Sequence, residues 1–347
     1  MMILSQKNLR LRKCKLLFRH HLSLSPSWIQ VLIGLLILAI WSSAWAATYR
    51  LPADGDNVVG DLKYTWVKSH QTLLDIARQY DLGFNEITSA NPGIDPWLPQ
   101  KGTRILLPTR YVLPAAPHHG IVVNLAEMRL YYFPATSNGV AKQVITHPVS
   151  IGQKGWATPV GEFVINMKID NPNWTMPLAV YRERVKEGYK GRRLVPAGPD
   201  NPLGQFAMQL NADNLYIHGT NKPYGIGMRV SRGCIRLYPE DIKSLIRQVP
   251  DGTQVNIVEQ PYKFGHKRSV IYLEAHKPII SGKKTGTDLT PVIAGVIKAG
   301  VGKLSPSEWQ HIVRFAEKYT GVAVPLLDHV AAEVQATAIS LSSVAKK

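Results

Sequence analysis

The alternation of apolar and polar positions predicts a small mixed module near the start of the chain, over residues 64–110. Short alternating runs at 64–67 and 102–108 predict strands. Between them, apolar residues at helical spacing predict one helix over 72–80 and a second over 84–90, which ends at Asn91-Pro92-Gly93. The expected order is strand, helix, helix, strand, preceded by an extended linker at 47–63.

The pattern changes to strands after Gly120. The runs GIVVNLAEMRLYYF, QVITHPVSIG and GEFVINMKI alternate and are separated by turn residues, which predicts a mostly antiparallel β domain over 119–259. Residues 172–204 interrupt it with many turn formers around one charged, helix-compatible piece. Long excursions of this kind are commonly binding loops or lids.

The C-terminal extension, 260–347, is expected to be partly helical. A strand is predicted at 270–274, followed by a linker rich in glycine, lysine and threonine. A helix capped by Ser305 or Ser307 and ended by Gly321 comes next. Its apolar face contains Trp309, Ile312, Val313, Phe315 and Ala316. No pattern in this region points to a function.

Residues 1–46 have the features of an export signal. A basic front without acidic residues precedes the apolar run WIQVLIGLLILAIW, and Ala44 and Ala46 occupy the small-residue positions of a cleavage site. The alternative is an uncleaved membrane anchor, since the apolar window widens to roughly the 20 residues that span a bilayer. Both interpretations place the bulk of the chain outside the cytoplasm.

The formal net charge is +17, and it falls to +11 without residues 1–46, which hold six basic residues. There is no basic stripe with interleaved aromatic residues and no nucleic-acid-binding motif, so we expect no nucleic-acid partner. Attraction to a carboxylate-rich polymer outside the cytoplasm, such as a cell wall, fits this charge better.

Cysteine usage draws attention to one residue. The chain has two cysteines, Cys14 and Cys234, and Cys14 lies in the predicted signal. An exported protein with one remaining cysteine carries a free thiol into an oxidising compartment, which favours a functional role for that thiol. The alternative is a small apolar residue in the core.

The segment IHGTNKPYGIGMRVSRGCIRL favours nucleophilic catalysis. Cys234 needs a base because a free thiol is largely protonated at neutral pH, and His218, sixteen positions earlier, ends a strand-like run. The turn-rich loop between the two residues is expected to bring Cys234 back toward His218. The Gly219 carbonyl is expected to orient the imidazole. The backbone N–H groups of Arg232, Gly233 and Cys234 are candidates for an oxyanion hole.

The residues after Cys234 predict a helix with Pro239 in its first turn, whose dipole would favour a thiolate. Arg236 is the leading candidate for binding a substrate carboxylate, and Arg229 and Arg232 are similar candidates. The alternative for each arginine is an exposed surface charge.

No cofactor or metal site is expected. His70, His118, His119, His147 and His266 lack metal-ligand spacing, and the Gly225–Gly227 turn lacks the third glycine and the strand-to-helix context of a dinucleotide site.

The first module resembles a LysM domain on the strength of TLLDIARQYD, ITSANPGID and LPQKGTRILLP. This implies binding to glycans such as peptidoglycan, although Ser69-His70-Gln71 replaces the usual Gly-Asp. The alternative is a packing domain without a ligand.

The motifs IHGTN, SRGCIRL, TPVGEF and VPAGPDNPLG resemble the YkuD family of L,D-transpeptidases, and more closely its ErfK/YbiS/YcfS/YnhG branch. The resemblance implies a YkuD-like β-sandwich and a periplasmic location. It also implies Cys234 as nucleophile, His218 as base with Gly219 orienting it, Ser231 shaping the loop, and Arg236 and Tyr216 at the substrate. Arg232 is a departure, since many members have a second histidine there.

Such enzymes cleave the diaminopimelate–D-alanine bond of a tetrapeptide stem and pass the acyl group from cysteine to an amine. The implied acceptors are another diaminopimelate, giving a 3-3 crosslink, or the lysine of an outer-membrane lipoprotein. Carbapenems are expected to acylate the cysteine. The alternatives are hydrolysis, as an L,D-carboxypeptidase or amidase, and a peptidoglycan-binding wall anchor without activity.

Overall fold

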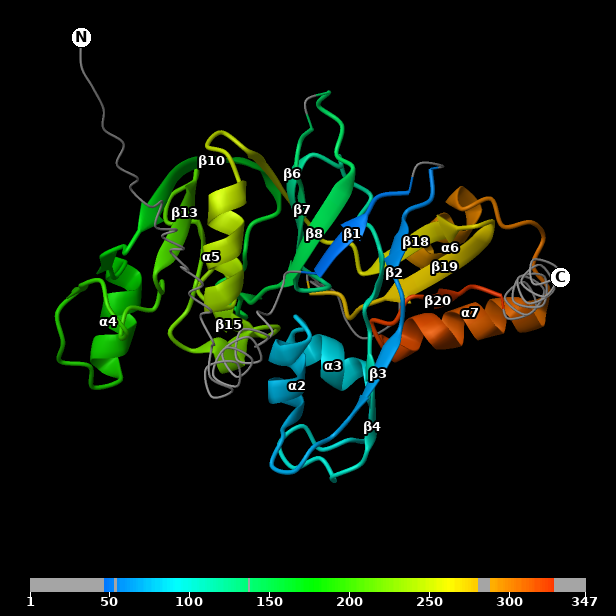
Figure 1. Cartoon of the computed structure of the whole chain (residues 1–347), viewed down its shortest axis with the longest axis horizontal. Coiled ribbons are helices and arrows are strands. Elements are labelled where there is room, and N and C mark those ends of the chain that lie inside the picture. The colour runs from blue at the N-terminus through cyan, green and yellow to red at the C-terminus, as the bar shows by residue number, and fades with distance from the viewer. Residues whose placement is uncertain (1–46, 53–54, 137, 280–287, 328–347) are drawn as a thin grey trace, which may run out of the picture. The chain divides into compact units, whose positions relative to one another are not determined.

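The computed structural model describes residues 47–52, 55–136, 138–279 and 288–327 (Figure 1). The predicted export signal and Cys14 lie outside these ranges. Within them, no helix combines the length and the apolar character needed to cross a bilayer.

The first module has the predicted order of elements. Strands β3 (Lys63–Trp66) and β4 (Arg104–Leu107) pair antiparallel around helices α2 (Leu73–Gln79) and α3 (Phe84–Ala90). Thr72 starts α2 because its hydroxyl accepts from the Asp75 N–H while the Asp75 carboxylate accepts from the Thr72 N–H. The apolar residues that predicted the helices, among them Leu73, Ile76 and Ile87, form a core of their own.

The segment expected as a linker, 47–63, is extended but not free. Strand β1 (Ala47–Arg50) pairs antiparallel with β8 (Gln143–Pro148), and β2 (Val58–Gly60) pairs with β5 (Arg110–Val112). Linker is therefore the wrong description for these strands. Their backbone groups complete neighbouring sheets, a long-range pairing that a local pattern does not reveal.

Nine strands in the described ranges form one sheet in the order β1-β8-β7-β6-β17-β10-β13-β14-β16. The part β1-β8-β7-β6 can be followed in Figure 1. The pairs β6–β17 and β14–β16 are parallel and the others antiparallel, which confirms the mostly antiparallel prediction. The strands not yet located are β6 (Gly120–Asn124), β7 (Arg129–Phe133), β10 (Gly161–Asp170), β13 (Phe206–Leu210), β14 (Tyr216–His218), β16 (Ile235–Arg236) and β17 (Gln254–Val258).

Strand β10 joins two halves of this sheet. Its first residues pair with β17, and after an irregularity between Ile165 and Met167 it continues along β13. Apolar side chains from both halves, such as Val123 and Met208, share one core, which is the arrangement of a β-sandwich. Helix α5 (Pro239–Gln248) adds Ile242 and Leu245 to that core and lies alongside β13 (Figure 1).

The excursion at 172–204 has structure of its own. Strands β11 (Trp174–Thr175) and β12 (Leu194–Val195) pair antiparallel and flank helix α4 (Leu178–Lys186). Three large apolar residues, Leu178, Val185 and Leu194, are exposed on it. The remaining short elements of the domain are β9 (Ile151–Gly152), the 3-10 turn η1 (Pro223–Gly225) and β15 (Arg229–Ser231), and β15 pairs with β9.

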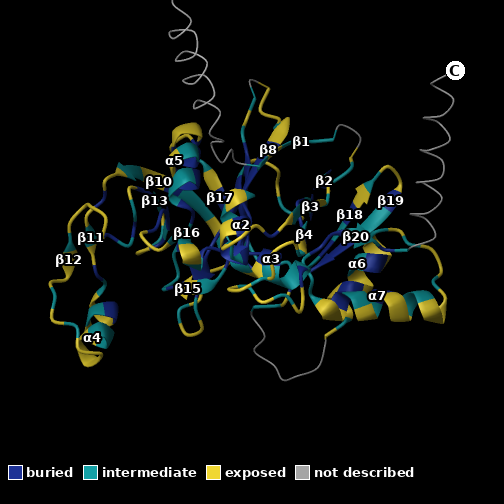
Figure 2. Cartoon of the chain, turned by 60° about the horizontal axis from the view of Figure 1, so that its bottom comes forward, coloured by how far each residue is buried: buried dark blue, intermediate teal, exposed yellow. Residues whose placement is uncertain are grey.

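The C-terminal extension forms a three-stranded sheet, β18 (Tyr262–Lys267), β19 (Val270–Ala275) and β20 (Val324–Pro325), with α6 (Thr290–Lys298) and α7 (Pro306–Lys318). Ser305 is the cap of α7, as one of the two predicted alternatives. The helix buries Ile312 and Ala316 and leaves much of its surface exposed (Figure 2). It ends three residues before Gly321, because Tyr319 already has a left-handed backbone with φ of 49°.

The LysM-like module packs on the transpeptidase-like domain through a buried ion pair. Arg129 of β7 is fully buried, and its Nε and Nη2 donate to the two Glu86 oxygens at 2.7 and 2.9 Å. Helix α3 also begins against the loop that precedes Cys234, since the Phe84 N–H donates to the Ile226 carbonyl at 3.0 Å. The module therefore supports the loop that carries the candidate site.

Candidate active site

Two neighbouring parallel strands bring the candidate residues to one face of the sheet. Ile217 of β14 lies opposite Ile235 of β16, and both are fully buried in the core. Side chains alternate between the faces of a strand, so the residues flanking these two isoleucines share the other face. Those residues are Tyr216 and His218 on β14, Arg236 on β16, and Cys234, which directly precedes β16.

The Cys234 side chain is a partly buried thiol with a carbonyl partner. Its Sγ donates to the Asn214 carbonyl at 3.2 Å. Burial raises the pKa of Cys234, although the Tyr216 N–H and the Arg236 charge act in the opposite direction. The expectation that a helix dipole would favour a thiolate was wrong. Helix α5 begins only at Pro239, after β16, and burial outweighs the positive groups nearby.

His218 is also buried, with 2% of its surface exposed. Burial lowers the pKa of His218 to about 3, and the positive charge of Arg236 adds to this, while the Gly219 and Leu203 carbonyls oppose it. The imidazole is therefore neutral at physiological pH. The Gly219 carbonyl lies near the ring as predicted, but His218 Nδ1 makes no hydrogen bond of normal geometry to any described residue.

The loop before Cys234 is shaped by hydroxyl groups. The Ser231 hydroxyl donates to the Cys234 carbonyl at 2.5 Å, and the Thr158 hydroxyl donates to the Gly233 carbonyl at 2.8 Å. Gly233 has a φ of 104°, a backbone conformation that favours glycine. Among the described residues, the N–H groups of Arg232, Gly233 and Cys234 have no backbone acceptor, so all three are available as donors.

The three candidate arginines differ in what they contact. Arg232 forms an ion pair with Glu183 of α4 at 2.7 Å, and Arg229 donates from Nε to the Gly152 carbonyl at 3.3 Å. Arg236 is half-buried and has no carboxylate within ion-pair distance in the described part of the chain, and its buried Nε lacks a hydrogen-bond partner. Arg236 is therefore the arginine that is best prepared to receive an external carboxylate.

Three contributors were not identified as site residues from the sequence. Thr158 lies in the TPVGEF motif, and the resemblance of that motif to the family was the signal that could have identified it. Its hydrogen bonds to Gly152 and Gly233 are visible only in the folded structure. The Asn214 carbonyl and the Glu183 carboxylate act through contacts across twenty and forty-nine positions. No local pattern marks such contacts.

The described residues hold two groups of carboxylates and histidines with the composition of a metal site, namely Asp81, His147 and Asp241, and Glu127, Glu274 and His276. Neither group includes Cys234 or His218.

The candidate site lies within a stretch of the chain that matches a known protein family. Residues 118–257 match the family model of the YkuD L,D-transpeptidase catalytic domain. The chain is 41% identical to the probable L,D-transpeptidase ErfK/SrfK of Salmonella typhimurium, over 76% of this chain and 87% of that protein. It is 40% identical to the probable L,D-transpeptidase YcfS of Escherichia coli, over 76% of this chain and 83% of that one.

A solved structure, the catalytic domain of the E. faecium L,D-transpeptidase, is 19% identical and superimposes with a TM-score of 0.31, covering 42% of this chain and 100% of that chain. The sequence matches confirm the resemblance that the motifs indicated. The chain belongs to the YkuD family of L,D-transpeptidases, a class of enzymes that acts on peptidoglycan.

Proposed function

We propose that Cys234 and His218 carry out L,D-transpeptidation on peptidoglycan stems. The observation that carries this proposal is the register of β14 and β16, which aligns Cys234, His218 and Arg236 on one face. A cysteine, a neutral base and a free guanidinium on one face are the groups that acyl transfer from a carboxylate-bearing peptide requires.

In the proposed first half-reaction, Cys234 Sγ attacks the carbonyl carbon between diaminopimelate and D-alanine of a tetrapeptide stem. His218 takes the thiol proton as the S–C bond forms, because the raised pKa of Cys234 keeps the thiol protonated before attack. The N–H groups of Arg232, Gly233 and Cys234 stabilise the negative oxygen. The C–N bond then breaks, and D-alanine leaves with the proton from His218.

In the second half-reaction, an amine attacks the Cys234 thioester and frees the thiol. We propose a diaminopimelate amine, giving a 3-3 crosslink, or the lysine of an outer-membrane lipoprotein. Hydrolysis by water, which would make the protein an L,D-carboxypeptidase or amidase, shares the acylation step and is separated from transfer by its products.

Arg236 is proposed to bind a stem carboxylate, and the lack of an internal carboxylate partner supports this role. Ser231 contributes through the loop, as its hydrogen bond to the Cys234 carbonyl suggests. Tyr216, which shares the face of Cys234, is proposed to line the donor site. Arg229 and Arg232 are proposed to act mainly on loop geometry, because both already have internal partners.

The location and the wall contacts follow from the same function. We propose that the enzyme works in the periplasm after export by residues 1–46, and that the LysM-like module contacts glycan strands. The excursion at 172–204 is proposed to cover the bound peptide, which the contact between Arg232 and Glu183 supports. Carbapenems are proposed to acylate Cys234, because their strained ring offers an electrophilic carbonyl to the same thiol.

Incubation of the protein with disaccharide-tetrapeptide muropeptides, with and without a lysine-ended lipoprotein peptide, tests the proposal by intact-protein and product mass spectrometry. We expect a thioester adduct on Cys234 and 3-3 dimers or peptide-linked muropeptides. Cys234→Ala should abolish both, and His218→Gln should slow adduct formation by at least about a hundredfold. Tripeptide alone would indicate hydrolysis. Absence of any adduct would leave a wall-binding protein without catalysis.

A further inference from the structure

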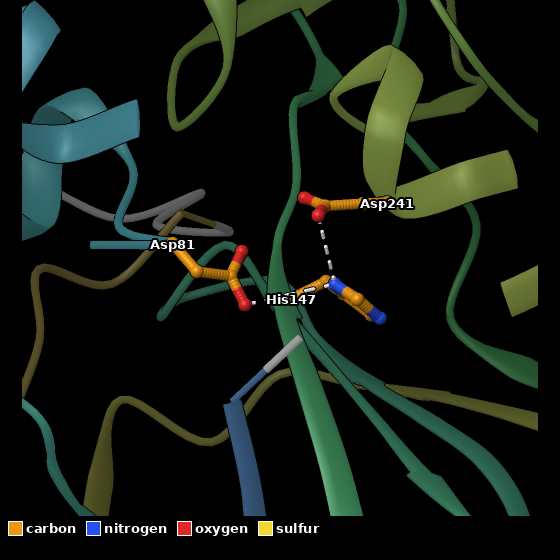
Figure 3. A group of neighbouring side chains, drawn as sticks. All are labelled: Asp81, His147 and Asp241. Atoms are coloured by element: carbon orange, nitrogen blue, oxygen red, sulfur yellow. Dashed lines mark ion pairs between the residues drawn. The ribbon is translucent and has the colours of Figure 1, made fainter. Parts of the chain in front are cut away.

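A buried cluster that includes neither Cys234 nor His218 has unsatisfied polar atoms. Asp81 follows α2 in the LysM-like module, His147 lies on β8 and Asp241 lies in the first turn of α5. All three side chains are buried, and His147 is fully buried. Both carboxyl groups are directed toward the same imidazole nitrogen (Figure 3).

The contacts in this cluster are longer than ordinary hydrogen bonds. His147 Nδ1 lies 3.4 Å from Asp241 Oδ1 and 3.7 Å from Asp81 Oδ2. Four buried atoms have no hydrogen-bond partner, namely Asp81 Oδ1, both ring nitrogens of His147 and Asp241 Oδ2. Buried polar atoms are nearly always paired, so such a group indicates a missing partner.

The spacing fits a metal ion as that partner. Zinc binds histidine nitrogen and carboxylate oxygen at about 2.1 Å, so two ligand atoms of a tetrahedral site lie roughly 3.4 Å apart. The three nearest ligand atoms here lie within 4.8 Å of one another. The Ala47 N–H donates to Asp81 Oδ2 at 3.1 Å and would orient that ligand. The two unpaired carboxylate oxygens are available to complete the coordination.

The positive charge near this cluster does not balance its two carboxylates. Against the effect of burial, Asp241 and Asp81 raise the pKa of His147 to about 10, so without a metal the imidazolium supplies one positive charge. Arg129, the nearby buried arginine, is already paired with Glu86 at 2.7 Å, which leaves the second carboxylate without a counterpart. A divalent ion with neutral His147 would bring this group to zero net charge. Buried charges are otherwise costly unless they are paired or coordinate a metal.

The second cluster provides an internal comparison. Lys263 donates to Glu127 and Glu274, both at 2.8 Å, and His276 lies 2.6 Å from Glu274. In that cluster a lysine supplies the positive charge and the contacts have hydrogen-bond length. The Asp81 cluster has similar ligand types, longer distances and no lysine or arginine paired to its carboxylates in the described part of the chain.

From these observations we propose that Asp81, His147 and Asp241 bind a structural divalent cation, with zinc as the first choice. The ion joins the LysM-like module, β8 and the helix that follows the Cys234 loop. The three ligands come from distant parts of the chain, which is why no local ligand spacing revealed them. The site does not depend on the proposed reaction.

The test uses the full chain carrying Cys234→Ala, so that this thiol cannot bind metal. The protein is dialysed against a chelator, loaded with zinc chloride alone and dialysed again. We expect about one zinc per chain, a higher midpoint of thermal unfolding, and an X-ray absorption spectrum with one nitrogen and otherwise oxygen ligands. Asp241→Asn and His147→Gln should each weaken zinc binding by at least about tenfold.

His276→Gln, in the lysine-containing cluster, is the matched control and should bind zinc like the parent. Circular dichroism establishes that each variant is folded. If a variant does not fold, the X-ray absorption spectrum of the parent still shows whether zinc is bound by one nitrogen and oxygen ligands. The proposal is overturned if the parent retains no zinc, if sulfur or two imidazoles appear in the coordination shell, or if His276→Gln weakens binding as much as His147→Gln. An NMR signal of a protonated His147 that zinc does not change would also overturn it.

Discussion

Arg232, two residues before Cys234, pairs with Glu183 in the middle of α4, with Nη2 and Nε at 2.7 and 3.1 Å from the same carboxylate oxygen. The contact joins the candidate catalytic loop to the excursion at 172–204. The two side chains are 31% and 41% exposed, so the pair contributes little to stability and its effect is mainly on geometry.

Glu183→Gln should therefore alter substrate use more than folding. We expect KM for a tetrapeptide donor to rise by up to about fivefold, because the excursion is less often placed over the loop. The alkylation rate of Cys234 by iodoacetamide should stay within twofold or so of the parent. Glu187→Gln, the same change on an exposed residue at the end of α4, is the control. Equal effects of the two substitutions would contradict the role of the ion pair.

The raised pKa of Cys234 predicts a steep dependence of thiol reactivity on pH. Only the thiolate reacts with iodoacetamide, so below the pKa the rate should rise by about tenfold per pH unit, with no plateau near neutrality. Alkylation is followed by mass spectrometry from about pH 6 to pH 9. Cys234→Ala serves to subtract the reaction of Cys14. A plateau below about pH 7 would mean that the resting cysteine is a thiolate.

The lowered pKa of His218 predicts a loss of stability in acid. The folded-state pKa is about 3, below the ordinary value of 6.5, so the unfolded state binds the proton first as pH falls. The contribution of His218 is complete above the unfolded pKa and is lost as pH decreases from about 6.5 toward 3, by up to about 1.4 kcal/mol per pH unit. Urea unfolding of parent and His218→Gln at several pH values should give a flatter profile for the variant. Parallel profiles would show that His218 is not buried in neutral form.

The buried pair of Arg129 and Glu86 should be required for the packing of the LysM-like module. Arg129→Met leaves a buried carboxylate without its partner, which is expected to cost about 3–5 kcal/mol in the free energy of unfolding. Adding Glu86→Gln should recover part of this loss, since the uncompensated charge is removed. Urea denaturation provides both values.

Arg78 and Glu240 form the matched comparison. They also join the LysM-like module to the transpeptidase domain, at 2.8 Å, but their side chains are 42% and 31% exposed. Arg78→Met should cost less than about 1 kcal/mol. Similar losses for the two arginine variants would indicate that burial does not decide the contribution of these pairs.

The sequence alone was sufficient for the elements of the LysM-like module and for the mostly antiparallel domain, and it singled out His218 and Cys234 as the candidates. Each of these depends on a local signal: the periodicity around Leu73 and Ile76, the alternation in the strands, and the glycines beside the histidine and the cysteine. Local signals can be recognised in a single sequence because they reflect backbone geometry within a few residues.

Only the tertiary structure decided the pairing of 47–50 with β8, the protonation states at the site and the cluster of Asp81, His147 and Asp241. The prediction of a thiolate at Cys234 failed because the helix starts at Pro239 and because burial, a property of the whole fold, controls the pKa. Strand pairing and buried charge join residues tens to more than a hundred positions apart, and their energies depend on desolvation that no short segment encodes.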